Sequence, residues 1–135
     1  PSIKLSNCCT PIPGDRITGY ISKGTGIAVH RTRCNNLQSL DKNRYIDVFW
    51  GNDTTKQYTV NIKLIVSNRD NVLAEIINTI TSTKGKVIQV AASTNKNKEG
   101  IIKLKLSIKH KAELENIIVN LQKIRDVFSI ERMMK

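Results

Sequence analysis

The feature that most constrains the fold is a hydrophobic period that changes repeatedly along residues 56–135. Apolar and polar residues alternate over residues 58–64 and, most regularly, over residues 102–108, which is the period of a half-buried strand. Apolar residues recur at positions i, i+3, i+4 and i+7 over residues 73–80 and 114–121, which is typical of a one-sided helix. Each predicted helix therefore follows a predicted strand.

Two further apolar runs complete this part of the chain. Residues 87–92 predict a strand after Gly85, which ends the first helix. Residues 127–133 predict a last strand with Phe128 and Ile130 on one face. The resulting order β-α-β-β-α-β predicts an α+β, ferredoxin-like domain in which two helices cover one face of a four-stranded antiparallel sheet.

Residues 1–55 have short apolar runs separated by turn-forming residues. The pattern predicts two short strands at 17–21 and 27–30, a tight turn at Gly24-Thr25-Gly26, a short helix within 31–40 and a loose strand at 44–50. The polar run 51–55 predicts a boundary between a small β-rich, cysteine-containing domain (1–55) and the ferredoxin-like domain (56–135). Modules below about 60 residues often require a metal, a covalent link or a neighbouring domain.

The charge of the chain constrains its partners. Lys and Arg number 22 against 11 Asp and Glu, which gives a net charge of +11, of which +8 falls in residues 56–135. This predicts an anionic partner, nucleic acid foremost, with an acidic protein surface as the alternative.

Other classes of function are disfavoured by what the sequence lacks. No apolar run is long enough for a membrane span and no signal peptide is present, so we expect a cytoplasmic protein with reduced cysteines. No Ser-His-Asp pattern, P-loop or carboxylate pair stands out, so we interpret the fragment as non-enzymatic. The chain opens with Pro1 rather than Met, which indicates a piece of a longer protein.

Three thiols and one imidazole form a candidate metal site: Cys8, Cys9, His30 and Cys34. This is the donor set of a closed structural zinc site, and the spacing of His30 and Cys34 suits it. Adjacent cysteines in an extended chain point to opposite sides, so both reach one metal only if the backbone bends, for example at the proline-containing run 11–13. The alternative is that the cysteines fill a small core as reduced thiols.

The predicted sheet also has a basic face. The strands at 58–64 and 102–108 are the central pair of a ferredoxin-like sheet, so their polar side chains share the face opposite the helices. This face is predicted to carry Thr59, Asn61, Lys63, Lys103, Lys105 and Lys109. It lacks the aromatic residues on which RNA bases stack. Phosphate binding by charge, packing against another sheet and an ordinary solvated lysine face all remain open.

Two stretches of the first half carry a family resemblance. They are Cys8-Cys9-Thr10-Pro11-Ile12-Pro13-Gly14-Asp15-Arg16-Ile17 and Ile27-x-Val29-His30-Arg31-x-x-Cys34-x-Asn36-Leu37. Together they resemble the C-terminal regulatory region of the long Rel/SpoT homologues, the bifunctional (p)ppGpp synthetase/hydrolases of the bacterial stringent response. The resemblance covers essentially the whole chain. It implies a cysteine-rich, zinc-finger-like domain at 1–55 and an ACT domain, also called RRM-like, at 56–135.

The resemblance implies a regulatory role on the ribosome. A region of this kind contacts ribosomal RNA and uncharged tRNA and controls the upstream catalytic domains of a GTP/GDP pyrophosphokinase and (p)ppGpp hydrolase. The resemblance also marks Cys8, Cys9, His30 and Cys34 as one family motif, and whether it holds a structural zinc ion stays open at this point. The RNA-binding candidates are the lysines of the sheet face (Lys63, Lys103, Lys105 and Lys109) and, in the first domain, Arg16, Arg31 and Arg33.

The loop after the first strand of the ACT domain departs from the family pattern. Amino-acid-binding ACT domains usually place a glycine here, whereas the loop of this chain is Asn68-Arg69-Asp70-Asn71, with Asn71 at the glycine position. Asn tolerates a positive φ but adds a side chain where a ligand would approach. The substitution therefore argues against amino-acid binding at this loop but is compatible with pairing to a second copy. The alternative function is an ACT module that binds an amino acid or forms a homodimer without contacting nucleic acid.

Overall fold

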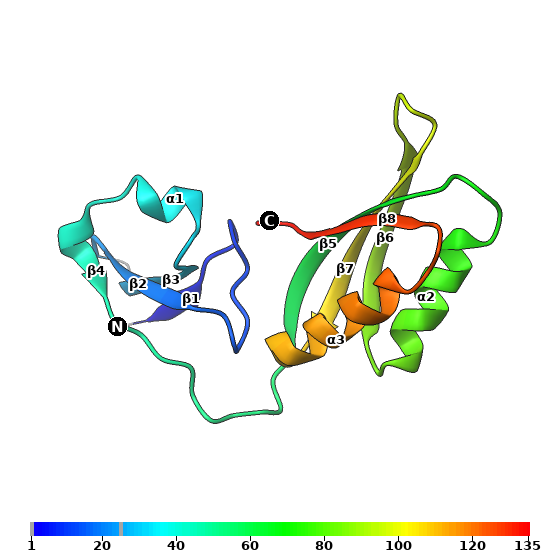
Figure 1. The fold of residues 1–135 in the computed structure, drawn as a ribbon. Helices are drawn as coiled ribbons and strands as arrows, with labels where there is room; N and C mark the ends of the chain where they lie inside the picture. The colour runs from blue at the N-terminus through cyan, green and yellow to red at the C-terminus, as the bar shows by residue number, and fades with distance from the viewer. Residues whose placement is uncertain (1, 25) are drawn as a thin grey trace.

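The computed structural model describes residues 2–24 and 26–135, and in this part of the chain the strands form two four-stranded sheets (Figure 1). The first sheet has the order β1-β3-β2-β4, with β1 parallel to β3 and the other pairs antiparallel. Its elements are β1 (Ile3–Leu5), β2 (Ile17–Ser22), β3 (Gly26–Arg31), α1 (Asn35–Gln38), a 3-10 turn (Lys42–Arg44) and β4 (Tyr45–Ile46).

The first sheet differs from the prediction at both edges. β1 was not predicted, and β4 is shorter than the strand expected at 44–50. In the predicted tight turn Gly24 and Gly26 have φ values of 74° and 96°, a conformation that favours glycine, while Thr25 lies outside the described residues. The short helix expected within 31–40 is present as α1.

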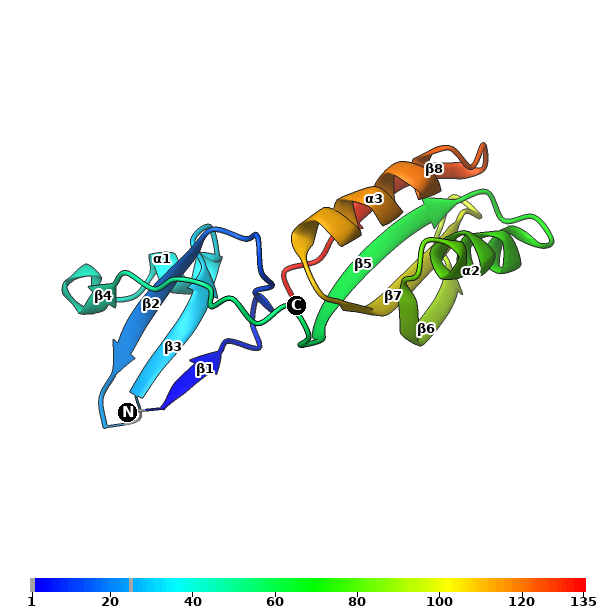
Figure 2. The same cartoon turned by 90° about the horizontal axis from the view of Figure 1, so that it is seen from below.

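The second sheet confirms the predicted ferredoxin-like α+β fold. It has the antiparallel order β6-β7-β5-β8, and α2 and α3 cover the same face of it (Figures 1 and 2). Its elements are β5 (Tyr58–Val66), α2 (Val72–Ser82), β6 (Lys86–Thr94), β7 (Gly100–Ile108), α3 (Lys111–Gln122) and β8 (Val127–Arg132).

The core of the second sheet follows from its two hydrophobic periods. Alternate residues of β5 and β7 point toward the helices and meet the apolar stripes of α2 and α3. Fully buried members include Val60, Ile62, Leu64, Ile76, Ile80, Leu104, Leu106, Ile117 and Leu121. Burying a side chain of this kind contributes about 1.5–3 kcal/mol, so this layer is the main stabilising element of the chain.

A bulge in the pairing of β5 with β8 overturns one prediction. The register shifts between Ile65 and Val66, and as a result Val127 and Ile130 pack against the core while Phe128 is exposed. Phe128 and Ile130 therefore do not share a face. Simple alternation cannot predict this, because a bulge adds one residue to one strand.

Residues 10–15, which we call the docking loop, pack the first half of the chain against the second sheet. Ile12 of this loop is fully buried in the hydrophobic core of the second sheet. The Lys111 N–H at the start of α3 donates to the Pro13 carbonyl at 2.8 Å. Gly14 has a φ of 101°, and a Cβ there would lie 2.7 Å from the Cβ of Lys111. The docking loop therefore belongs to the first half in sequence and to the second half in packing.

Candidate metal centre and nucleic-acid interface

The structure brings the four predicted metal ligands together. Cys8 Sγ lies 3.4 Å from His30 Nδ1 and 3.6 Å from Cys34 Sγ, and Cys9 Sγ lies 3.9 Å from His30 Nδ1. All four ligand atoms lie within 4.8 Å of one another. With Zn–S near 2.3 Å and Zn–N near 2.0 Å, ligand atoms of a tetrahedral site are about 3.5–3.8 Å apart. The donor set and its spacing therefore fit a structural zinc ion.

A turn at residues 6–10, which we call the cysteine turn, explains how adjacent cysteines reach one centre. The Thr10 N–H donates to the Ser6 carbonyl at 3.0 Å, and Thr10 has a φ of 43°, so the backbone is coiled rather than extended. The bend therefore begins before the prolines rather than at them. β3 supplies His30, and Cys34 immediately precedes α1.

Burial disfavours a thiolate at Cys9 in the absence of a cation. Burial raises the pKa of the Cys9 thiol to about 12, against the opposing effect of the Arg31 N–H, which donates to its sulfur at 3.2 Å. Burial would raise the pKa of Cys34, but hydrogen bonds from the Leu37 N–H, from the Cys8 thiol and from further groups together lower it. Burial lowers the pKa of His30, which keeps the imidazole neutral. A bound cation would favour thiolate and neutral imidazole together.

The hydrophobic core around the cluster is small. Cys9, Cys34 and Leu37 are buried, and Tyr20 and Tyr45 pack against them. The Tyr45 hydroxyl donates to the Leu37 carbonyl at 2.6 Å. Since so few apolar side chains are buried here, a metal ion would supply much of the stability of this half.

A buried ion pair ties the docking loop to the end of the second sheet. Arg132 of β8 donates to both carboxylate oxygens of Asp15, at 2.7 and 2.8 Å, and to the Thr10 carbonyl at 3.0 Å. The two side chains are 13% and 4% exposed. Burial would raise the pKa of Asp15, but hydrogen bonds from Arg132 and from the Ile12 N–H, 2.9 Å away, hold it below its usual value. Asp15 is therefore ionised at neutral pH.

A basic cleft lies at the junction of the two halves. Its volume is about 460 Å³, and it is lined by Asp15, Arg16, Arg31, Thr32, Arg33, Lys111, Arg132 and Met134. The negative charge of Asp15 is already paired with Arg132. The remaining cations make the cleft attractive to an anion such as phosphate.

The predicted arginines do not play equal parts in this cleft. The Arg31 guanidinium donates to the Cys9 carbonyl at 2.7 Å and to the Met133 carbonyl at 3.1 Å, so it joins the cysteine turn to the end of the chain. Arg16 and Arg33 are exposed and line the cleft. Their guanidinium groups are therefore more available than that of Arg31 for binding a ligand.

The predicted lysines lie on another surface. Lys63 pairs with Lys103 and Asn61 with Lys105 across β5 and β7, on the face opposite the helices. On its other side Lys63 faces Glu131, which reduces the positive charge there. Lys109 lies beyond the end of β7 and outside this paired set.

Sequence reasoning missed Arg132 and Lys111 of the basic cleft. Arg132 meets Asp15 across 117 residues, and no local pattern marks such a pair. Lys111 stands at the first residue of α3 and reaches the cleft only because the docking loop packs there. Their positions depend on tertiary structure.

The loop at residues 68–71 has a left-handed residue at the position where the family pattern places a glycine. Asn71 has a φ of 72° and precedes α2. Arg69 is held by ion pairs with Asp126 and with Glu75, the latter at 2.9 Å. A cavity of about 210 Å³ lies between this loop and the ends of β6 and β7.

Two family descriptions match the sequence. Residues 1–51 match the RelA/SpoT RIS domain, and residues 54–132 match the ACT domain, which is more than half of the chain. A crystal structure of the ACT domain from the GTP pyrophosphokinase of Chlorobium tepidum has a TM-score of 0.51 and 17% identity, covering 58% of this chain and all of that one. At this identity the likeness supports the fold alone.

Curated relatives match along nearly the full length. A GTP pyrophosphokinase of Photobacterium angustum is 32% identical over 133 residues, and the bifunctional (p)ppGpp synthase/hydrolase RelA of Mycobacterium tuberculosis is 30% identical over 132 residues. The alignments cover 96% and 94% of this chain but 18% of each relative. The chain therefore belongs to the ACT domain family. More particularly, it is a C-terminal region of a Rel/SpoT protein, as the cysteine-containing motifs indicated.

Within the described residues, helices long and apolar enough to cross a membrane are absent.

Proposed function

We propose that this region contacts ribosomal RNA and uncharged tRNA, and that it thereby controls the upstream catalytic domains of a (p)ppGpp synthetase/hydrolase. The observation that carries the proposal is the basic cleft, in which the one acidic side chain is paired internally. An excess of cations around a concave surface suits the phosphate backbone of RNA. The parent activity is inferred from relatives named GTP pyrophosphokinase.

The proposed zinc ion is structural and shapes the RNA-binding surface. Arg31, Thr32 and Arg33 line the cleft and lie between His30 and Cys34 in sequence. A metal held by these two ligands would fix the conformation of the segment that connects them. The cysteine-rich domain would then orient the arginines rather than carry out chemistry.

Charge reversal in the cleft tests the proposed RNA contact. We expect Arg16→Glu combined with Arg33→Glu to lower affinity for deacylated tRNA at least about tenfold near 0.1 M salt, because two phosphate contacts are lost. The slope of log affinity against log salt should flatten by about 1.5. Fluorescence anisotropy over a salt series measures both quantities.

The matched control is Lys103→Glu combined with Lys105→Glu, which changes the net charge equally on the open face of the sheet. We propose this face as a secondary contact and expect a smaller loss of affinity. Equal losses in the two double variants would show that net charge alone matters, and would contradict a contact located in the cleft.

A second proposal concerns self-association through the edge of the second sheet. β6 is an edge strand whose residues are largely exposed, including Ile88 at 51% and Val90 at 41%. Unpaired backbone groups beside exposed apolar side chains favour pairing with another strand. We therefore expect a homodimer, seen as a concentration-dependent mass in sedimentation equilibrium. A constant monomer mass up to near-millimolar protein would remove this proposal.

A further inference from the structure

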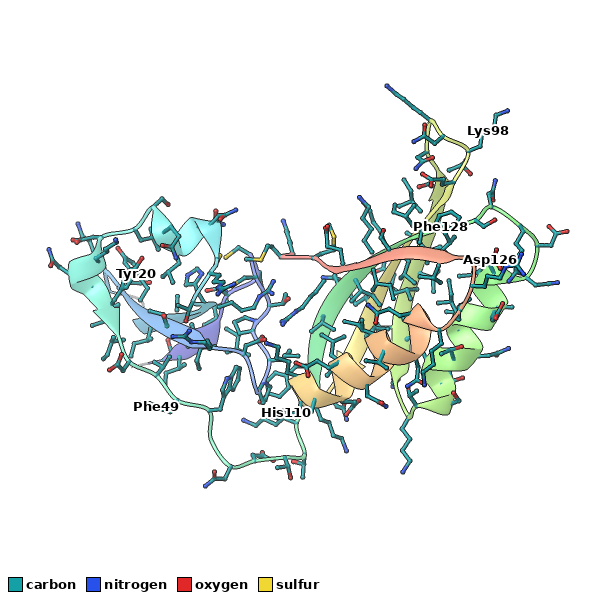
Figure 3. The ribbon with its side chains drawn as sticks, in the orientation of Figure 1. Tyr20, Phe49, Lys98, His110, Asp126 and Phe128 are labelled. Atoms are coloured by element: carbon teal, nitrogen blue, oxygen red, sulfur yellow. The ribbon has the colours of Figure 1, made fainter. Side chains whose placement is uncertain are left out.

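The side chain of Phe49 is exposed to solvent and is not packed in a core. It is 87% exposed, on the segment that leaves β4 at the outer edge of the first half (Figure 3). Its neighbour Trp50 is anchored, since the indole N–H donates to the Asp15 carbonyl at 3.0 Å and the ring meets that of Tyr58 edge to face at 5.8 Å. Phe49 therefore projects from a backbone that is fixed beside it.

Phe49 borders a hollow that adjoins the basic cleft. This second cavity, of about 380 Å³, is lined by Phe49, Arg16, Thr18, Asp47 and other residues. It shares Asp15, Arg16 and Thr32 with the basic cleft. A flat aromatic ring and a cluster of cations thus lie on adjoining parts of one surface.

The two cavities differ in the chemistry they offer. The basic cleft holds an excess of cations and suits phosphate. The second cavity has Arg16 as its one lining cation beside the exposed carboxylate of Asp47, together with two aromatic residues and two threonine hydroxyls, so it suits the flat, hydrogen-bonding surface of a nucleobase better than phosphate. The basic cleft therefore suits the phosphate of a nucleotide, and the second cavity suits its base.

We propose that Phe49 is a stacking platform for an unpaired base of an RNA strand whose phosphates lie in the basic cleft. The inference rests on the proposed RNA contact and adds the form of RNA that is recognised. A base inside a duplex is stacked on both faces and offers none to Phe49, so the site selects single-stranded or looped RNA over the body of a duplex. It also places the aromatic platform in the first domain rather than on the sheet of the ACT domain.

The test compares a short single-stranded RNA with a blunt duplex of equal length, using fluorescence anisotropy. Phe49→Ala should weaken binding of the single strand about tenfold and change duplex binding less than about twofold. Phe49→Tyr should retain the affinity of the unchanged chain, because it keeps a ring. Since neither substitution removes a charge, the salt slope should stay the same. Because Phe49 is exposed, both variants should keep the native circular dichroism spectrum.

The controls separate this inference from the proposed function. Arg16→Glu should weaken both RNA forms and flatten the salt slope. If Arg16→Glu has this effect while Phe49→Ala binds single strands like the unchanged chain, the stacking site is overturned and the RNA contact stands. If the unchanged chain binds neither RNA at low salt, the proposed function fails and the stacking site with it. Guanosine monophosphate binding as tightly as the oligonucleotide would overturn the assignment to an RNA strand.

Discussion

Chelating a metal ion from Cys8, Cys9, His30 and Cys34 is expected to unfold the first sheet while the sheet of β5–β8 stays folded. The first half has a small core, so metal binding would be a large part of its folding free energy, on the order of 10 kcal/mol. The second half has its own extensive core and should survive. Two-dimensional amide NMR before and after a strong chelator resolves the two sets of signals.

Substitution of one ligand should have the same effect as the chelator. We expect Cys34→Ser to lose the signals of the first half, whereas Ser39→Ala, an exposed change next to the same short helix, should not. Inductively coupled plasma analysis should find about one zinc per chain. Zinc below about a tenth per chain in undamaged protein, with signals unchanged by chelation, would show that the thiols are ordinary core residues.

Replacing Arg132 with Met is expected to destabilise the chain by about 3–5 kcal/mol. The substitution leaves the Asp15 carboxylate buried without its partner, and breaking a buried pair is strongly unfavourable for this reason. Adding Asp15→Asn should recover part of the loss, because Asn keeps an acceptor for the Ile12 N–H without a charge. Urea denaturation of both variants and the unchanged chain measures the difference.

The same ion pair predicts an acid dependence. The folded pKa of Asp15 is depressed, so its stabilisation is present above its ordinary pKa of about 3.9 and is lost as pH falls through the lower folded value. Asp15→Asn should show a weaker loss of stability below about pH 4. An Arg132→Met variant as stable as the unchanged chain, or an Asp15→Asn variant with the same acid dependence, would contradict a stabilising role for this pair.

The second half was largely predictable because its information is local. Strict alternation over residues 58–64 and 102–108 and the helical stripes between them fix which side chains face the core. The exception is β8, where the bulge exposes Phe128. The three-residue β1 is too short to show a period, and its partner in the sheet is not the next strand in sequence but β3, where Ile3 pairs with Ile27.

The sequence indicated which residues form the candidate metal site, but it did not indicate how the fold brings them together. The residue types of Cys8, Cys9, His30 and Cys34 indicated a candidate metal site. The turn that brings the adjacent cysteines to one centre includes the positive φ of Thr10, which the residue types do not indicate. The basic cleft forms from residues near both ends of the chain, brought together by the docking loop. Contacts between residues so far apart in the chain produce no regular spacing in the sequence, so a single sequence does not reveal them.

The proposed contact with the ribosome and uncharged tRNA is tested most directly by co-sedimentation of this chain with ribosomes that carry deacylated tRNA in the acceptor site, over a series of salt concentrations. We expect binding at low salt that weakens linearly on a double-logarithmic plot, with a slope of about 0.7–0.9 for each phosphate contact. We also expect Arg16→Glu combined with Arg33→Glu to reduce both the binding and the slope. Absence of binding at low salt, or binding that is independent of salt and of these arginines, would contradict the proposed function.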